Sequence, residues 1–201
     1  MEKPAETQYP IEEILKRRWS PRAFADRMVE PEKLQSLWEA ARWAASSFNE
    51  QPWFFIVATK EKPEEHARLL SCLVEGNQRW ARRAPVLMVS VAKLNFDKTG
   101  KPNRHAFHDV GLAVENMIVQ ATALGLFVHQ MAGFSPEKVA ELYKIPDECE
   151  PVAAIAVGYG GDVEDLPESF REQELGGRSR KPVSSFVFEG RWGNASPIVS
   201  E

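Results

Sequence analysis

The chain has little cysteine and no long apolar run. Its two cysteines, Cys72 and Cys149, lie far apart and form no CxxC pair, so we expect reduced thiols in a cytoplasmic protein. No apolar run approaches the roughly 20 residues that span a bilayer. The stretch Met1–Glu6 is polar and lacks the apolar core of a secretory signal. We therefore expect no membrane partner.

An excess of positive charge is also missing. The 25 Lys and Arg residues are outnumbered by 29 Asp and Glu residues, which gives a formal net charge of −4. A chain with this balance has no general attraction for nucleic acid or for an anionic membrane surface, so neither is expected as a partner.

Several well-known chemical motifs are absent. There is no phosphate loop of the GxxxxGKS/T type and no HExxH zinc motif. Gly158–Gly161 follows an apolar run, but Asp162–Pro167 comes next, and its acids would repel a pyrophosphate. His105-Ala-Phe-His108-Asp109 places two imidazoles on one helix face, yet nothing nearby completes a metal site, so no metal is expected.

The order of predicted elements indicates an α+β fold in one domain spanning residues 1–201. The sequence predicts strands over the apolar runs 52–59, 85–92 and 151–159, an extended segment over 127–131, and a last strand over 182–189. It predicts helices over 9–16, from Pro31 onward, 63–73, 77–83, 107–124 and from Pro136 onward, with 93–104 and 160–177 as loops.

The strongest predicted helix, residues 107–124, is apolar on most of its circumference. Phe107, Val110, Val114 and Met117 follow helical spacing, and positions between them, such as Leu112, are also apolar. A helix of this kind is buried on more than one side, which favours a second subunit as a partner.

Three separated segments could form an anion site. The run Arg17-Arg18-Trp19-Ser20-Pro21-Arg22 offers permanently charged guanidinium forks and a hydroxyl, and Arg178-Ser179-Arg180 offers two more forks. Ser46–Trp53 is rich in small polar groups just before a strand. Each segment has an ordinary alternative, a solvated charged surface for the basic runs and a frayed helix end for Ser46–Trp53.

The same segments resemble the signatures of the FMN-dependent nitroreductase family. Arg18-x-Ser20-x-Arg22 is similar to its Arg-x-Ser-x-Arg signature, and Ala40–Trp53 resembles its second signature through Ser46-x-x-Asn49-x-Gln51-Pro52-Trp53. The resemblance continues through Gly125, Gly133-Phe134 and Arg178–Pro182. Trp19, Ala45, Phe48 and Glu50 depart from the family pattern, and the first and third of these could reshape a flavin pocket.

The resemblance implies a mixed or antiparallel sheet of about four to five strands flanked by helices, in an intertwined homodimer with FMN at the interface. Residues 182–201 would extend over the partner subunit. The implied cofactor-binding residues are Arg18, Trp19, Ser20, Arg22, Ser46, Ser47, Asn49, Asn77, Gln130, Met131, Ala132, Gly133, Arg178 and Arg180. Arg22 would tune the flavin electrostatically, and backbone N–H groups of Ala132 or Gly133 would face N5.

The implied activity is an NAD(P)H oxidoreductase of nitroreductase or quinone-reductase type. Hydride would pass from NAD(P)H to flavin N5 and then to an electron-poor acceptor, such as a nitroaromatic or a quinone, in one shared site with ping-pong kinetics. Two alternatives stay open: a flavin-fragmenting or dehalogenating relative on the same scaffold, and a flavin-binding redox sensor with little turnover.

Overall fold

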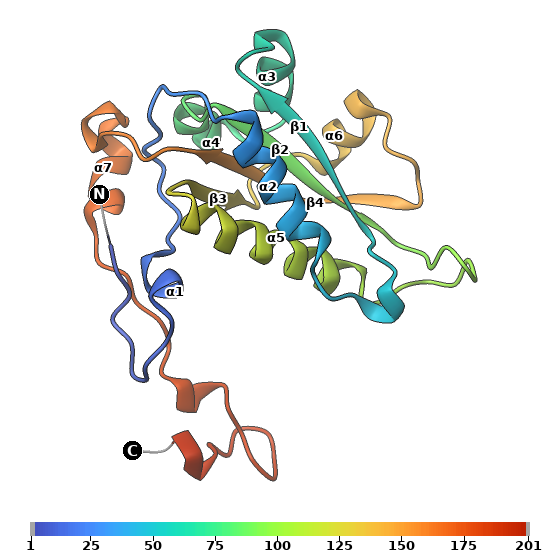
Figure 1. Cartoon of the computed structure of the whole chain (residues 1–201), viewed down its shortest axis with the longest axis vertical. Helices are drawn as coiled ribbons and strands as arrows, with labels where there is room; N and C mark the ends of the chain where they lie inside the picture. The colour runs from blue at the N-terminus through green and yellow to red at the C-terminus, as the bar shows by residue number, and fades with distance from the viewer. Residues whose placement is uncertain (1–2, 200–201) are drawn as a thin grey trace.

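A four-stranded antiparallel sheet forms the centre of the molecule (Figure 1). The computed structural model describes residues 3–199. In spatial order the strands are β1 (Trp53–Thr59), β2 (Val86–Lys93), β4 (Cys149–Gly158) and β3 (Phe127–Met131). Each strand overlaps one of the segments 52–59, 85–92, 127–131 and 151–159 for which the sequence predicts extended structure.

Both faces of the sheet are covered by helices, and β2 shows how the sequence achieves this. Val86, Met88 and Ala92 join the core formed with α2 (Pro31–Arg42) and α5 (Ala106–Ala123). Residues Leu87 and Val89, which alternate with them, join the opposite core. Because successive strand residues point to opposite faces, an uninterrupted apolar strand supplies two cores.

The second core lies under α3 (Pro63–Leu70), α4 (Glu75–Ala81) and α6 (Pro136–Tyr143). Helix α6 begins as the sequence predicts, with the Ser135 hydroxyl accepting a hydrogen bond from the backbone N–H of Lys138 at 3.1 Å. The predicted α+β class, with an antiparallel sheet flanked by helices, is confirmed.

The two ends of the chain run side by side away from this body (Figure 1). The N-terminal end contains α1 (Glu13–Arg17), and the C-terminal end follows α7 (Glu168–Leu175). The backbone N–H of Val183 donates to the side chain of Gln8 at 2.9 Å and joins the two ends. The short 3₁₀ turns are η1 (Ser47–Asn49), η2 (Val163–Asp165), η3 (Val183–Ser185) and η4 (Pro197–Val199).

Three predictions of secondary structure are wrong. Tyr9–Glu12 are not helical, because Pro10 disfavours the α conformation at Tyr9 and the helix starts only at Glu13. The segment 160–177 is not a loop throughout, because it contains the helix α7. Most residues of this helix are polar, so the helical spacing of Phe170 and Glu174, which lie on its inner side, was not recognised.

The third error is the strand over 182–189, where the chain instead forms η3 and a single bridge between Phe188 and Ala195. No neighbouring strand lies beside this segment within the described part of the chain, so its alternating pattern cannot form a ladder. Residues 200–201 of the predicted arm 182–201 lie outside the described residues.

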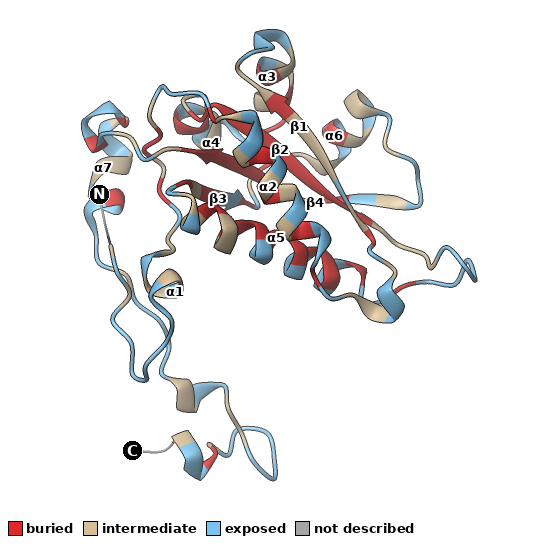
Figure 2. Cartoon of the chain, viewed as in Figure 1, coloured by how far each residue is buried: buried red, intermediate tan, exposed pale blue. Residues whose placement is uncertain are grey.

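Helix α5 is the longest helix between residues 3 and 199, and no helix in that range has the length and apolar character needed to cross a bilayer. Its inner face packs on the sheet through Val110, Val114 and Met117. On its outer face Phe107 and Leu112 are 45% and 37% exposed, so apolar surface remains uncovered in the single chain (Figure 2).

A close backbone contact attaches the N-terminal segment to the end of β4. Gly161 donates its N–H to Ala23 at 2.9 Å, and Ala25 donates to Tyr159 at 3.0 Å. A Cβ atom at Gly161 would lie only 2.5 Å from the carbonyl carbon of Phe24 and 2.6 Å from its oxygen. The approach therefore requires glycine on steric grounds.

Replacing Gly161 by alanine should lower the free energy of unfolding by roughly 1–3 kcal/mol, because rigid backbone atoms would have to move. Urea denaturation would measure this change. Gly76→Ala is the matched control, since nothing lies within 4 Å of a Cβ there and the site is helical. Equal stability of the two variants would contradict the steric argument.

Candidate functional site

Three predicted guanidinium groups from opposite ends of the chain come together. The side chain of Arg178 is partly buried, and its burial together with the positive charges of Arg18 and Arg180 lowers its pKa. Arg18 also donates to the Ser20 hydroxyl at 3.4 Å. Among residues 3–199 no carboxylate pairs with any of the three arginines, so the cluster carries uncompensated positive charge.

Arg178 holds the N-terminal segment through its backbone. Its guanidinium donates to the carbonyls of Lys16 at 3.0 Å, Arg18 at 2.7 Å and Lys3. These three bonds leave two of the five N–H donors of the side chain for another partner. Arg178 therefore positions Arg18. The side chain of Arg180 is exposed, and its hydrogen-bond partner among the described residues is the neighbouring Ser179 carbonyl at 2.7 Å.

Glu174 fixes the other end of the same basic run, a role that the sequence did not predict. Its side chain on α7 is buried, and its carboxylate accepts hydrogen bonds from the backbone N–H groups of Arg22, at 2.9 and 3.1 Å, and Ala23, at 3.1 Å. The backbone from Arg18 to Ala23 is thus held by Arg178 through carbonyls and by Glu174 through N–H groups.

His129 supports this turn from β3. Its Nδ1 lies 2.9 Å from the Pro21 carbonyl, so this nitrogen carries the proton and donates it, and its ring packs 4.6 Å from the ring of Trp80. Burial, reinforced by the positive charge of Arg22, lowers the pKa of His129 to about 4. The imidazole is therefore neutral near pH 7.

Trp19 and Arg22 have contacts within the chain. The Trp19 ring packs edge-on against Phe127, 6.0 Å between centroids, and its Nε1 is buried without a hydrogen-bond partner among residues 3–199. The guanidinium of Arg22 lies 5.7 Å from the centre of the Phe170 ring on α7. Trp19 thus packs inward from the basic run.

Asn77 lies at the predicted segment Gln130–Gly133. Its side-chain amide donates to the Gly133 carbonyl at 3.0 Å and accepts from Nε1 of Trp80 at 3.3 Å. A Cβ at Gly133 would lie 2.6 Å from the Asn77 amide nitrogen, so glycine is needed for this contact. Within the segment Met131 is buried, whereas Gln130 and Ala132 are exposed.

The third predicted part, Ser46–Gln51, forms a turn with unusual backbone angles. Phe48, Asn49 and Gln51 have φ values of 54°, 55° and 54°, in the left-handed region that costs energy for residues other than glycine. The turn is held by a hydrogen bond from the Gln51 N–H to the Ser46 hydroxyl at 3.0 Å and by one from the Ser47 N–H to the buried Asp109 carboxylate at 3.0 Å.

This turn and the arginine cluster are separated within one chain. Figure 1 shows η1 at the end of α5 that begins with Ala106, and α1 toward the other end of α5. The 18 residues of α5 extend over about 27 Å at the usual rise per residue. The predicted binding residues therefore include two groups that lie apart: Arg18 and Arg178 beside α1, and Ser46, Ser47 and Asn49 in the turn at η1.

Other candidate chemistries find little support. Within residues 3–199 no group of three or more His, Cys, Asp or Glu side chains is arranged to hold a metal ion. His108 instead lies 3.3 Å from the carboxylate of Asp109. Burial raises the pKa of the Cys149 thiol, which opposes a role as a thiolate nucleophile.

Known proteins share both the sequence and the fold. Residues 15–159 match the model of the nitroreductase family. A solved structure described as an oxidoreductase containing FMN superposes with a TM-score of 0.89 at 33% identity, over 94% of this chain and 96% of that one. An uncharacterised 15.4 kDa protein of Mycolicibacterium smegmatis is 33% identical over 131 residues, which are 65% of this chain and 86% of the relative.

A further relative is the FMN reductase (NAD(P)H) of Bacillus subtilis, 26% identical over 159 residues, which are 70% of this chain and 62% of that protein. The chain belongs to the nitroreductase family, and the resemblance inferred from its sequence signatures is confirmed.

Replacing Glu174 by glutamine should lower the free energy of unfolding by roughly 1–3 kcal/mol, because one amide oxygen cannot replace a carboxylate that accepts three bonds. Hydrogen exchange of the Arg22 and Ala23 amides should also become faster. Glu172→Gln, exposed on the same helix, is the matched control. Unchanged hydrogen exchange at both amides would show that Glu174 does not hold this part of the backbone.

Stability should fall as pH decreases through the range set by His129. The unfolded side chain takes up a proton near pH 6.5 and the folded one near 4, so between these values only the unfolded state binds it. The resulting loss is at most about 1.4 kcal/mol per pH unit. His129→Gln should flatten the dependence of urea stability on pH from 6.5 to 5, and an unchanged slope would contradict this assignment.

Proposed function

We propose that this protein is an FMN-dependent oxidoreductase that oxidises NADH or NADPH and reduces an electron-poor acceptor, such as a nitroaromatic or a quinone. The observation that carries the proposal is the uncompensated cluster of Arg18, Arg178 and Arg180. Clustered guanidiniums repel each other, and they form a favourable arrangement only when an anion such as a phosphate ester lies between them.

The residues at this cluster fit the phosphate of FMN. Within residues 3–199, Arg18, Ser20 and Arg180 keep donors that no other group uses and that could bind phosphate oxygens. Arg178 adds its charge and its two remaining N–H groups. Bound FMN would supply the chemistry, the reversible acceptance of a hydride. The protein contributes position and electrostatics.

Two further segments would hold the flavin ring. Arg22 would lie at the pyrimidine edge, where its fixed positive charge favours the reduced, anionic form. The backbone of Gln130–Gly133 would pass beside the ring, and Asn77 supports this role by bracing the Gly133 carbonyl. With Met131 buried, the segment would act through its backbone and through its exposed residues Gln130 and Ala132.

We further propose that the site is shared between two subunits of a homodimer. Ser46, Ser47 and Asn49 lie about a helix length from the arginine cluster, so one flavin would take these groups from different chains. The uncovered outer face of α5 supports this arrangement. So does the C-terminal arm, on which Phe186, Trp192 and Ile198 are 61%, 92% and 86% exposed.

The first test is the purified protein itself. We expect the visible absorption spectrum of oxidised flavin, bleaching on addition of NADH or NADPH, and steady turnover with a quinone as acceptor. A bound flavin that neither nucleotide reduces would instead support the redox-sensor alternative, and the absence of flavin binding would refute the proposal.

The phosphate assignment predicts a selective effect of Arg180→Ala. Losing one charge-assisted hydrogen bond should weaken FMN binding to the apoprotein by roughly 10- to 100-fold. Riboflavin, which has no phosphate, should keep its affinity. Titration calorimetry with both ligands measures the difference.

Lys181→Ala is the matched control, because Lys181 is the adjacent residue, is exposed and carries the same charge. It should change FMN affinity by less than about twofold, since a solvated charge contributes little. Equal weakening of FMN binding and riboflavin binding by Arg180→Ala would show that Arg180 does not bind the phosphate.

A further inference from the structure

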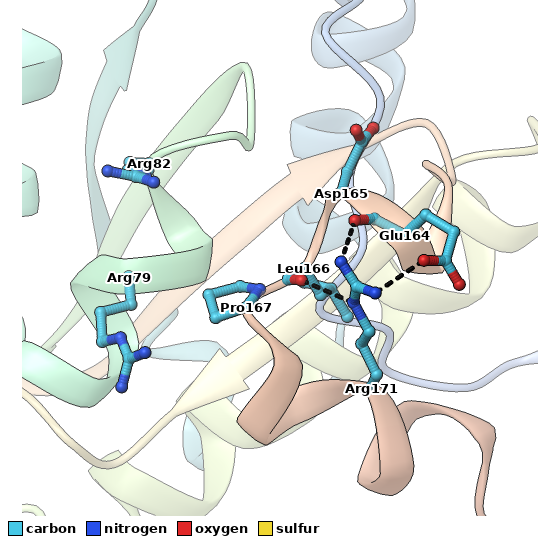
Figure 3. Close-up of a pocket in the computed structure, with 7 residues that line it drawn as sticks. All are labelled: Arg79, Arg82, Glu164, Asp165, Leu166, Pro167 and Arg171. Carbon is cyan, nitrogen blue, oxygen red and sulfur yellow. Dashed lines mark hydrogen bonds and ion pairs between the residues drawn. The ribbon is translucent and has the colours of Figure 1, made fainter.

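Helix α7, which carries Glu174 and precedes Arg178, is held at its start by one of its own side chains. The Arg171 guanidinium donates to the Glu164 carboxylate at 2.6 Å (Figure 3). It also donates to the carbonyls of Glu164, at 2.6 Å, and Leu166, at 3.0 Å. These three bonds attach the helix to the 3₁₀ turn η2 that precedes it.

The C-terminal end of α7 has no cation of its own. Its last turn contains no basic residue, although the last carbonyls of a helix carry partial negative charge and lack partners within the helix. Lys3 supplies a cation from the opposite end of the chain. Its ammonium donates to the carbonyls of Gly176, at 2.8 Å, and Glu174.

Lys3 contacts the chain on both sides of the connection between α7 and Arg178. Only Gly176 and Gly177 form this connection, and neither has a side chain that could anchor it. The Lys3 ammonium binds the carbonyls before the connection, and the Lys3 carbonyl accepts a hydrogen bond from the Arg178 guanidinium after it. A single residue thus fixes Arg178 relative to the end of α7.

The same residue contacts the basic run. The Lys3 ammonium lies 5.0 Å from the centre of the Trp19 ring. Two positions further on, Ala5 donates its backbone N–H to the Lys16 carbonyl at 2.9 Å, which keeps the N-terminal segment beside α1. Lys3 therefore lies where α7, Arg178 and the basic run meet.

The Lys3 ammonium also determines which acceptors are open to Arg178. Without it, the carbonyls of Glu174 and Gly176 would lack a cationic donor and would compete for the nearby Arg178 guanidinium. Arg178 would then turn away from the carbonyls of Lys16 and Arg18, and its two remaining N–H groups would no longer face the arginine cluster.

We propose that Lys3 is a positioning residue of the FMN site, which keeps the Arg178 guanidinium in the orientation that offers its two remaining N–H groups to the phosphate. The inference rests on the proposed function, because it takes the FMN phosphate as the ligand of Arg178. Lys3 acts through Arg178 and α7, since two of the three N–H groups of its ammonium already bind backbone carbonyls.

The first test is titration calorimetry of the flavin-free protein with FMN and with riboflavin. Lys3→Met keeps a long apolar side chain and removes the ammonium. It should weaken FMN binding by roughly 3- to 10-fold and riboflavin binding by less than about twofold, because riboflavin has no phosphate. Lys3→Arg, which can donate to the same carbonyls, should restore most of the affinity for FMN.

Lys62→Met is the matched control. Lys62 is exposed, carries the same charge and lies at the start of α3, outside the proposed site. This variant should change neither affinity.

Combination with Arg178→Ala distinguishes positioning from direct contact. If Lys3 acts through Arg178, Lys3→Met should cause no further loss of FMN affinity in a protein that already carries Arg178→Ala. Additive losses would show that Lys3 contacts FMN itself, and equal losses for FMN and riboflavin would indicate general damage to the fold. Either result, or an unchanged FMN affinity in Lys3→Met, overturns the inference.

A second measurement does not need flavin. The NMR signals of the Arg178 guanidinium report its proton exchange with solvent, which should become faster in Lys3→Met and stay slow in Lys3→Arg. A wild-type protein that binds no FMN would refute the proposed function, whereas faster exchange in Lys3→Met would still support the restraint of Arg178 by Lys3. Unchanged exchange would overturn the inference, whatever the protein binds.

Discussion

The basic run near the N-terminus can act as a site only because distant residues hold its backbone. Glu174 lies 152 positions from Arg22, and Arg178 lies 160 positions from Arg18, yet their side chains bond to the main chain of this run. The Glu174 carboxylate accepts hydrogen bonds from backbone N–H groups, and the Arg178 guanidinium donates to backbone carbonyls. With the backbone satisfied by these two charged groups, the side chains of Arg18, Ser20 and Arg22 do not have to stabilise the turn and remain available for a ligand.

The same arrangement couples folding to the site. Glu174 lies on α7 and His129 on β3, so the turn at Pro21 is attached to both a peripheral helix and the sheet. A buried carboxylate needs hydrogen-bond donors to replace water, and an imidazole largely shielded from water favours its neutral form. Displacement of α7 would therefore leave the Glu174 carboxylate and the N–H groups of Arg22 and Ala23 without their partners. The backbone that carries the arginines would also be less firmly held.

Much of the molecule could be predicted from local patterns, and the errors have physical causes. The four strands and α5 follow from apolar runs and helical spacing, and the site segments follow from signatures that resemble a family. Helix α7 was missed because a short, mostly solvated helix has a weak apolar pattern; Phe170 and Glu174, four residues apart, were its readable signal. The roles of Glu174 and His129 could not be found, since a bond from a side chain to a distant backbone leaves no trace in composition or spacing.

The proposed dimer would account both for the separation of the two groups of binding residues and for the apolar surface that the single chain exposes. A helix of 18 residues keeps η1 away from the arginine cluster, and no local rearrangement of a sheet-packed helix can close that distance. In a dimer, the outer face of α5 and the C-terminal arm would be covered by the same contact that completes the flavin site. Binding of the cofactor and association of the subunits would then stabilise one another, because each supplies an interaction that the other requires.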